Sequence, residues 1–381
     1  MDFSLTDEQQ ILRQSVREFA ENEILPVREE LDREEKFGYD ITREMFDMGF
    51  FGVILPPEYG GMGMDYLSYI LVVEELARVD GCQAATVAAA NSLGSCPIHC
   101  YGTEEQKRTF LPPLIADKLW GFGLTEPNAG SDAGGTETKA VKKNGEWILN
   151  GSKIFITNAA TDITLGSTIQ AVTGERADGK KEYTCFLVRQ NTPGYTTRAM
   201  HNKMTWRSSN TAEIYLDEVI VPEEDMLGQR GEGFHQMLET LDSGRLSIAA
   251  MGVGGAQGAY EAALKYAQER RQFGRPIGKF QTVALKLADM ATEIEAARNL
   301  LYKACWLKDN GKPFGTESAM AKLYASEIMK RAADGAVQIF GGYGLMEEYP
   351  AAKFYRDQRL LEIGEGTSEM QRLVISRKIG L

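Results

Sequence analysis

One carboxylate near the end of the chain carries the clearest chemical signal. Glu365 lies between Gly364 and Gly366, and two hydroxyl residues that can cap a helix follow it. Because glycine costs a helix roughly 1 kcal/mol relative to alanine, this segment predicts a helix break. On such a break a carboxylate can project towards a ligand, and the freed backbone N–H groups can donate to that ligand. Two interpretations fit: a general base on a loop, or the ordinary cap of a closing helix over residues 369–379.

Two upstream blocks favour the first interpretation. Residues 122–132 read Phe-Gly-Leu-Thr-Glu-Pro-Asn-Ala-Gly-Ser-Asp, and residues 149–158 read Leu-Asn-Gly-Ser-Lys-Ile-Phe-Ile-Thr-Asn. With the C-terminal block, and with Tyr59-Gly-Gly-Met-Gly, Glu269-Arg-Arg-Gln-Phe-Gly and Gln338-Ile-Phe-Gly-Gly-Tyr-Gly, they resemble the acyl-CoA dehydrogenase family, flavoenzymes that desaturate acyl-CoA thioesters. The blocks keep their order over nearly the whole chain, so the resemblance does not depend on a single motif.

The resemblance implies a reaction with three requirements. A base removes a proton from Cα, a donor stabilises enolate character at the thioester carbonyl, and an acceptor takes hydride from Cβ. No ordinary side chain accepts hydride, and the family uses FAD, with flavin N5 as the acceptor. In the family the base corresponds to Glu365. The backbone N–H of that residue and a ribityl hydroxyl of FAD both donate to the thioester carbonyl. Some relatives carry the base on an earlier helix, at the position of Gly244, which has no side chain here.

The resemblance also assigns residues to the cofactor and the substrate. In the family, the segment from Phe122 to Ser131 lines the flavin ring and Thr157 bonds N5. The residues between 270 and 342 hold pyrophosphate and adenosine, partly from a neighbouring subunit. The cofactor-binding residues so implied are Phe122, Leu124, Thr125, Gly130, Ser131, Phe155, Ile156, Thr157, Arg270, Gln272, Phe273, Gln281, Gln338, Ile339, Gly341, Gly342, Thr367 and Glu369. The substrate-binding residues so implied are Asn91, Ser131, Asp242, Arg245, Gly364 and Gly366.

Several positions depart from the family pattern. Many short- and medium-chain members carry a large aromatic residue where this chain has Gly364. The missing side chain either opens space for a branched or cyclic acyl group, such as an alicyclic carboxyl-CoA, or a neighbour refills the gap. Glutaryl-type relatives hold a distal carboxylate with an arginine at the position of Gln83 and carry a glutamate at that of Ala77, so a dicarboxylic substrate is disfavoured. Thr205 replaces a common glycine, and the sequence offers no functional explanation for it.

Composition narrows the classes of partner. The formal net charge of −12 argues against a nucleic-acid backbone as the main partner, which requires a basic face. No run reaches the ~20 apolar residues that a membrane helix needs. The N-terminus carries Asp2 and Asp7 rather than a basic segment and an apolar one, so no signal peptide is visible. We therefore expect a cytoplasmic protein, or a matured organellar one.

The five cysteines predict reduced thiols and no metal site. An odd, scattered set without a signal peptide argues against a disulfide framework. Cys96, His99 and Cys100 are types that can bind a metal, and a spacing of four can place the two thiols on one helix face. No fourth ligand lies nearby in the sequence, which favours partly buried thiols on a helix over zinc.

The elements that must position these residues fall into three groups. Residues 1–118 show helical periodicity, for example at Leu12, Val16 and Phe19. Residues 119–230 contain strand-like runs and the hairpin signal Asn144-Gly145. Residues 231–381 return to helices, with a core-facing stripe at Leu287, Met290, Ile294, Ala297, Leu301 and Ala304. The predicted fold is mainly α, with an N-terminal helical domain, a middle antiparallel β domain and a C-terminal four-helix bundle, the arrangement known for the family.

A glycine-rich segment within the last region is a decoy. Gly252-Val-Gly-Gly-Ala-Gln-Gly resembles a dinucleotide-binding fingerprint, but no strand precedes it and the glycine spacing differs. We interpret it as a site of close helix packing.

The leading hypothesis is an FAD-dependent acyl-CoA dehydrogenase that passes electrons to an electron-transfer flavoprotein and forms a homotetramer, as the resemblance implies. An acyl-CoA oxidase or an enoyl-CoA reductase on the same scaffold remains an alternative, because sequence separates these activities poorly. A nucleic-acid binder without activity is a third hypothesis, which the acidic charge and the retained Glu365 oppose.

Overall fold

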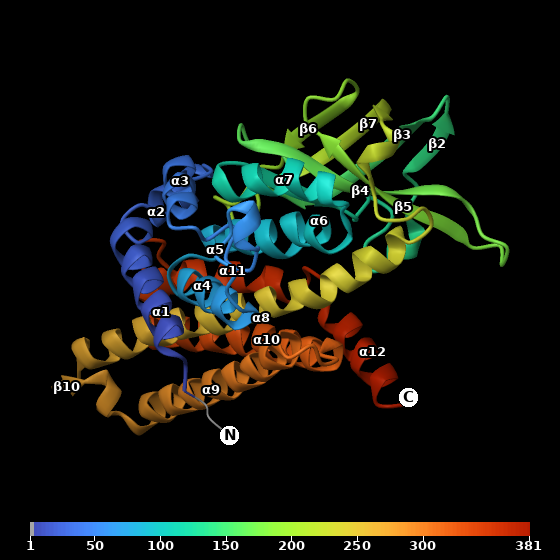
Figure 1. The fold of residues 1–381 in the computed structure, drawn as a ribbon. Coiled ribbons are helices and arrows are strands. Elements are labelled where there is room, and N and C mark those ends of the chain that lie inside the picture. The colour runs from blue at the N-terminus through green and yellow to red at the C-terminus, as the bar shows by residue number, and fades with distance from the viewer. Residues whose placement is uncertain (1–3) are drawn as a thin grey trace.

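The computed structural model describes residues 4–381, so the first three residues of the predicted N-terminal domain lie outside the described part. Short helices at the N-terminus and a β-sheet lie above a layer of long C-terminal helices (Figure 1). The N-terminal helices are α1 Asp7–Phe19, α2 Arg28–Glu34, α3 Tyr39–Asp47, α4 Tyr66–Val79, α5 Gly81–Ala89, α6 Cys96–Tyr101 and α7 Glu104–Ala116. Short turns of other helix types join them: η1 Ala20–Ile24, η2 Pro57–Tyr59 and η3 Ala90–Ser95.

The middle region forms one eight-stranded sheet. Its strands are β1 Leu119–Gly123, β2 Lys139–Lys143, β3 Glu146–Thr157, β4 Thr164–Glu175, β5 Lys181–Arg189, β6 Tyr195–Ala199, β7 Thr211–Val221 and β8 Met226–Leu227, with the turns η4 Ala133–Gly135 and η5 Glu223–Asp225. The order is β6-β7-β3-β2-β4-β5-β8, with β1 beside β4. Asn144 and Gly145 have φ of 54° and 88° and close the β2–β3 hairpin, as predicted.

The expectation of a purely antiparallel sheet is wrong at two pairings. Strands β1 and β2 both run parallel to β4, whereas the other pairs within the sheet are antiparallel. A parallel pair needs a long connection, and the whole β2–β3 hairpin lies between β1 and β4 in the chain. The strand patterns of the sequence carry no information on this direction.

The C-terminal helices are α8 Gly233–Glu269, α9 Gln281–Asp309, α10 Gly315–Phe340, α11 Pro350–Leu361 and α12 Ser368–Lys378. Short elements lie between them: β9 Arg271–Gln272, β10 Arg275–Pro276, η6 Ile277–Lys279 and η7 Gly341–Leu345. Within the described residues this region has five helices rather than four, because the glycines around Glu365 divide the last segment into α11 and α12. The stripe predicted on α9, from Leu287 to Ala304, is buried.

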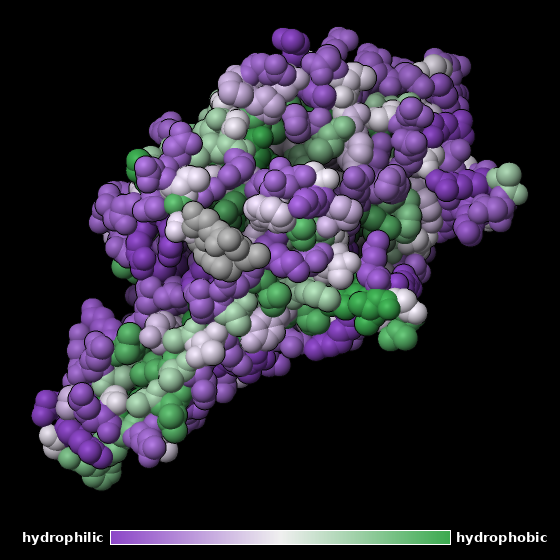
Figure 2. Space-filling view, turned by 60° about the horizontal axis from the view of Figure 1, so that its bottom comes forward, coloured by the Kyte–Doolittle hydropathy of each residue, from purple (hydrophilic) through white to green (hydrophobic). Residues whose placement is uncertain are grey.

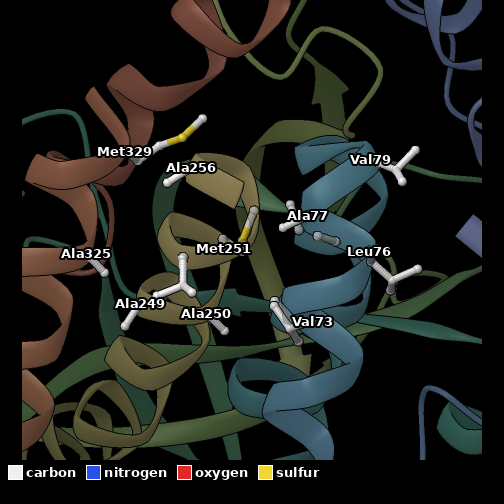
Figure 3. Close-up of a cluster of buried hydrophobic side chains, with 14 of the residues drawn as sticks. Val73, Leu76, Ala77, Val79, Ala249, Ala250, Met251, Ala256, Ala325 and Met329 are labelled. Carbon is white, nitrogen blue, oxygen red and sulfur yellow. The ribbon is translucent and has the colours of Figure 1, made fainter. Parts of the chain in front are cut away.

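Helix α8 lies in the core between α4 and α10, where small and branched side chains from all three helices pack together (Figure 3). Its glycines permit this close approach. A Cβ built on Gly254 would lie 2.1 Å from the carbonyl oxygen of Glu74, and one on Gly258 would lie 2.1 Å from that of Arg78. The interpretation of the glycine-rich segment as a helix-packing site is therefore confirmed.

The ends of α8 and α9 project from the rest of the molecule and are joined by β9 and β10 (Figure 1). We call residues 270–285 at this tip the arm. Hydrophobic surface continues from the arm along the underside of the long helices (Figure 2). Phe273 in the arm is 93% exposed. Over residues 4–381, no helix is both long and apolar enough to cross a membrane.

Thr205 has a structural explanation that the sequence did not offer. Its hydroxyl lies 3.3 Å from the backbone oxygen of Asp357 on α11, and the next residue, Trp206, donates its backbone N–H to the Asp357 carboxylate at 2.9 Å. Trp206 has a φ of 50°, so the backbone turns sharply here. The loop after β6 is thereby fastened to α11, the helix that leads to Glu365.

Candidate active site

Glu365 lies on the loop between α11 and α12 in a left-handed conformation, with φ of 52°. Non-glycine residues in this region are strained and are often found at functional sites. Thr367 caps α12, because its hydroxyl accepts a hydrogen bond from the backbone N–H of Met370 at 3.3 Å. The segment is therefore both a helix cap and a loop that projects a carboxylate.

The Glu365 carboxylate packs directly against helix α8 at Gly244. A Cβ built on Gly244 would lie only 1.9 Å from Oε2 of Glu365. The absence of a side chain at Gly244 thus provides the space in which the carboxylate lies. The two family positions for the base are neighbours in space, and this chain fills one of them.

Burial perturbs the acidity of Glu365. The residue as a whole is partly buried, but its Oε2 atom is fully covered and has no hydrogen-bond partner within residues 4–381. Desolvation raises the pKa of Glu365 to about 7, while the positive charges of Lys322 and Arg245 oppose this shift. A carboxyl group with a pKa near neutrality can hold or release a proton under ordinary conditions.

Two side chains fix the backbone of this loop. Lys322, on α10, donates from Nζ to the carbonyl oxygen of Gly366 at 2.7 Å. Gln371, on α12, donates to the same oxygen at 2.9 Å and to that of Glu365 at 3.2 Å. Within the described chain, the backbone N–H of Glu365 donates to no backbone carbonyl, so it is available to a ligand.

Among the predicted substrate residues, Asp242 and Arg245 lie together on α8, in the turns that contact Glu365. Arg245 forms an ion pair with Asp242, and its buried Nε atom lacks a partner within the described residues. Burial raises the pKa of Asp242, and the charge of Arg245 opposes that effect. With Gly364 and Gly366, these residues surround the carboxylate with a cation and a polar backbone.

The other predicted substrate residues lie differently. Ser131 is exposed on the loop that follows β1. Asn91 is fully buried and donates both amide hydrogens to backbone carbonyls, those of Phe50 and Val87, each at 2.9 Å. Its Oδ1 atom has no partner in the described chain. Asn91 therefore braces the π-helical turn η3, and a direct contact with substrate stays a prediction.

The gap left by Gly364 is partly filled. A Cβ built on this residue would lie 3.1 Å from Cδ2 of Leu360, one turn earlier on α11. Gln83 is buried, and its side chain lies beside Gly38, at the start of α3. Leu360 lies four residues before Gly364 and could have been found from helical spacing, whereas the contact of Gln83 with Gly38 depends on how α5 packs against the start of α3.

The predicted flavin residues of the sheet form one surface. The register of β3 against β7 is interrupted between Lys153 and Ile156, and Phe155 within this bulge has φ of 61° and a side chain that is 61% exposed. Bulges of this kind redirect side chains near functional sites. Ile154 donates its backbone N–H to the carbonyl of Thr125 at 2.9 Å, which ties the two predicted flavin segments together.

This surface fits a flat aromatic cofactor. An exposed phenyl ring beside the half-buried hydroxyl of Thr157 offers both a stacking face and a hydrogen bond. Phe122, Leu124 and Ile156 are buried beneath it, whereas Thr125 is partly exposed and Gly130 is exposed. Thr367 is the N-cap of α12, and Glu369 lies in the first turn of that helix.

A buried ion pair supports this surface and was missed in the sequence. Lys153 and Glu126 are both buried, and their charged groups lie 2.6 Å apart. Glu126 also accepts hydrogen bonds from the backbone N–H groups of Glu137 and Thr138. The available signal was a lysine directly before the apolar run Ile154-Phe155-Ile156 in β3.

The remaining predicted cofactor residues form a second group at the far end of the molecule. Arg270 and Tyr343 lie close, with the guanidinium 5.5 Å from the ring centroid, which joins the arm to η7. Figure 1 places β10 at the opposite end from the sheet. A single chain therefore does not bring the two groups together. The exposed members of this second group are Arg270, Gln272, Phe273, Gln281, Gln338, Gly341 and Gly342, while Ile339 is buried.

The cysteines suggest no metal centre at the site. Cys96 and Cys100 place their sulfur atoms 3.7 Å apart on α6. In the described chain, three other side chains bring potential metal-ligand atoms close together: Asp32, Cys82 and Asp357. The ammonium of Lys353 already lies among them, 2.6 Å from Asp357 and 3.4 Å from Asp32, so a cation is supplied by the protein itself.

Comparisons with known proteins agree with this arrangement. Family models of the N-terminal, middle and C-terminal domains of acyl-CoA dehydrogenases match residues 6–118, 121–219 and 231–380. A probable acyl-CoA dehydrogenase of Bacillus subtilis is 50% identical, and a short-chain-specific acyl-CoA dehydrogenase of Clostridium acetobutylicum is 45% identical, each over the full length of both chains. An NADH-dependent acryloyl-CoA reductase of Anaerotignum propionicum is 42% identical over all of this chain and 96% of its own.

Solved structures give the same result. Butyryl-CoA dehydrogenase of Megasphaera elsdenii superposes with a TM-score of 0.96 at 44% identity, over the full length of both chains. A chain from work on the electron transferring flavoprotein of Acidaminococcus fermentans gives the same values. A glutaryl-CoA dehydrogenase bound to glutaryl-CoA also reaches 0.96, at 40% identity over all of this chain and 97% of that one. This chain therefore belongs to the acyl-CoA dehydrogenase family, and it is an FAD-dependent oxidoreductase that dehydrogenates acyl-CoA thioesters.

Proposed function

We propose that Glu365 is the catalytic base that removes the α-proton of the acyl-CoA substrate. The observation that carries the proposal is its carboxylate oxygen, buried against Gly244 with no hydrogen-bond partner in residues 4–381. Since burial brings its pKa to about 7, the carboxylate binds a proton more strongly than an ordinary glutamate does.

The backbone of the same loop supports the second requirement of the reaction. The N–H of Glu365 is free of backbone acceptors in the described chain, and it can donate to the thioester carbonyl as negative charge develops there. Lys322 and Gln371 hold the adjacent carbonyls, so this donor is already oriented. FAD, when bound, supplies the acceptor for hydride, and Phe155, Thr157 and Thr125 are the residues that would hold its ring.

We propose a short acyl group as the substrate. Leu360 occupies part of the space beside Gly364, which supports refilling of the gap over an enlarged pocket. The similarity to short-chain and butyryl-CoA dehydrogenases points the same way. Anaerobic flavin bleaching by butyryl-CoA, isobutyryl-CoA and cyclohexanecarboxyl-CoA tests this. Faster bleaching by the cyclic thioester than by butyryl-CoA would overturn it.

We propose further that the enzyme is a homotetramer in the cytoplasm that passes its electrons to an electron-transfer flavoprotein. The separation of the two predicted cofactor groups supports an assembly in which the arm of one subunit completes the site of another. The related chain described with an electron transferring flavoprotein supports the choice of carrier.

A reductase is the second candidate, because the acryloyl-CoA reductase is similar over the whole chain. Two flavin assays distinguish a dehydrogenase from a reductase: reoxidation of the substrate-bleached enzyme, and reduction of the oxidised enzyme by NADH. Rapid reoxidation by an electron-transfer flavoprotein supports a dehydrogenase, whereas rapid flavin reduction by NADH with acryloyl-CoA as acceptor supports a reductase.

The substitution Glu365→Gln tests the assignment of the base. The variant keeps the shape of the side chain but cannot accept a proton, so we expect flavin reduction by butyryl-CoA to slow by roughly 10²- to 10⁴-fold. Glu362→Gln is the matched control, since Glu362 pairs with Arg359 on the same segment. Near-normal reduction in Glu365→Gln would exclude Glu365 as the base.

A further inference from the structure

Lys322 is a buried lysine whose positive charge has no role in the reaction as described above. Its side chain has no exposed surface, and it lies on the core-facing side of α10, beside residues such as Ala319 and Ala325. Lysine is almost never fully buried unless its charge is paired. Its burial therefore requires a compensating interaction, and the interaction lies at the Glu365 loop.

The ammonium group binds this loop through the backbone. Nζ donates to the carbonyl oxygen of Gly366 at 2.7 Å, and this oxygen also accepts from Gln371. Gly366 has φ of 91°, and a Cβ built on it would lie 2.7 Å from Nε2 of Gln371. The carbonyl thus lies between two donors, which fixes the peptide between Gly366 and Thr367.

The charge of Lys322 also acts on Glu365, although the two groups form no ion pair within 4.0 Å in residues 4–381. Burial lowers the pKa of Lys322 to about 8, and the negative charge of Glu365 opposes that effect. The titratable and charged groups that face the pair come from four other helices: Tyr66 and Tyr69 on α4, Asp242 and Arg245 on α8, Glu362 at the end of α11, and Glu369 on α12. Asp242 pairs with Arg245, whereas Lys322 forms no ion pair within residues 4–381 and its charge acts on Glu365.

We propose that Lys322 is a positioning residue for Glu365: its ammonium group fixes the Gly366 peptide, and its charge keeps the neighbouring carboxylate ionised and ready to accept a proton. This inference rests on the assignment of Glu365 as the base. It accounts for a buried charge in α10 that packing alone does not require.

The pH dependence of flavin reduction by butyryl-CoA tests the proposal, with FAD-loaded enzyme. Removal of the positive charge raises the pKa of Glu365, so a higher pH is needed to ionise the base. An increase of one unit, from about 7 to about 8, lowers the ionised fraction at pH 7 about fivefold, while little changes at pH 9. We therefore expect Lys322→Gln to lose about fivefold or more at pH 7 and to recover at high pH.

Two further variants separate charge from hydrogen bonding. Lys322→Met removes both the charge and the hydrogen bond, so we expect an additional loss of flavin-reduction rate that is the same at every pH. Because methionine suits a buried position, this variant also serves if the glutamine variant does not fold. Lys330→Gln is the control, since Lys330 lies on the same helix but is exposed. Its pH profile should match that of the unmodified enzyme.

The outcomes separate the two proposals. An inactive Glu365→Gln together with an unshifted profile in both neutral Lys322 variants overturns the role of Lys322 and leaves the base in place. An active Glu365→Gln overturns the assignment of the base itself. A shifted profile in the neutral variants, with an unshifted one in Lys330→Gln, supports the proposal.

Discussion

At the scale of single residues, the structure places a carboxylate where it is poorly solvated. Its folded-state pKa of about 7 lies above the value of 4.5 expected for an exposed glutamate. The stabilisation that follows from this shift is fully present below pH 4.5 and is lost as the pH rises through 7, because the buried carboxylate then ionises. Above pH 7 the ionised group costs at most roughly 3 kcal/mol.

This cost predicts a gain in stability for Glu365→Gln at alkaline pH. The amide is neutral at every pH, so we expect the variant to melt at a higher temperature than the unmodified holoenzyme at pH 8, and the two to differ little at pH 5. Thermal unfolding at both pH values measures the effect. Glu362→Gln should show no such gain, because it removes an ion-pair partner of Arg359. Equal melting temperatures at pH 8 would contradict the burial of the charge.

Gly244 offers a second prediction at the residue scale. A Cβ at this position would lie 1.9 Å from the Glu365 carboxylate, so in Gly244→Ala the carboxylate must move. We expect flavin reduction by butyryl-CoA to fall by about tenfold or more, because small misplacements of a catalytic group reduce rates strongly, while FAD content and melting temperature stay close to normal.

Gly364→Ala is the comparison for this prediction, since its Cβ would lie 3.1 Å from a flexible leucine side chain. That variant should retain most of the rate. If Gly244→Ala reduced its flavin at the normal rate, the carboxylate would not depend on the space at Gly244.

At the scale of elements, sequence patterns predicted those features of helices and turns that depend on residues close together in the chain. The Asn144-Gly145 turn and the buried stripe on α9 each depend on residues close in the sequence. The glycines of α8 were recognised as a packing site from their local pattern, but the helix they pack against, α4, could not be named from it. The parallel pairing of β1 and β2 with β4 does not depend on residues close in the sequence, since strand direction depends on the path of the chain between them. Spacing alone could not reveal it.

The candidate site likewise combines features that the local sequence predicts with contacts between residues far apart in the chain. The position of Glu365 on a helix break could be predicted from Gly364 and Gly366, whereas its contact with Gly244 joins residues 121 positions apart in the chain. Lys322 could have attracted attention as a charge on an apolar helical stripe, but its partner could not be named. The bulge that exposes Phe155 depends on the register of β3 against β7, which the strand pattern leaves open.

At the scale of the whole molecule, the two groups of predicted cofactor residues lie at opposite ends of one chain (Figure 1). The sheet offers a stacking surface, while the arm offers exposed polar groups and the 93% exposed ring of Phe273. A single subunit leaves that ring largely in water, in a T-shaped arrangement with the ring of Phe280 at a centroid distance of 5.9 Å. Burial of such a surface between subunits removes the cost of exposing it.

This arrangement predicts that assembly and FAD binding depend on the same residue. We expect Phe273→Ser to weaken FAD binding by about thirtyfold, the loss expected for a ring at the low end of interface hot spots, and to shift the protein towards smaller oligomers. Light scattering after size-exclusion chromatography, read together with the ratio of flavin to protein absorbance, measures both effects.

Ile11→Ser removes another exposed apolar side chain, on α1 away from the arm, and should change neither quantity. The folded state of each variant can be checked by its melting temperature with saturating FAD. Because Phe273 is almost fully exposed, its replacement has little to disturb inside one subunit. A Phe273→Ser protein that keeps both its size and its flavin would show that the arm does not complete a neighbouring site, and a single chain would then have to bind FAD through the surface around Phe155 alone.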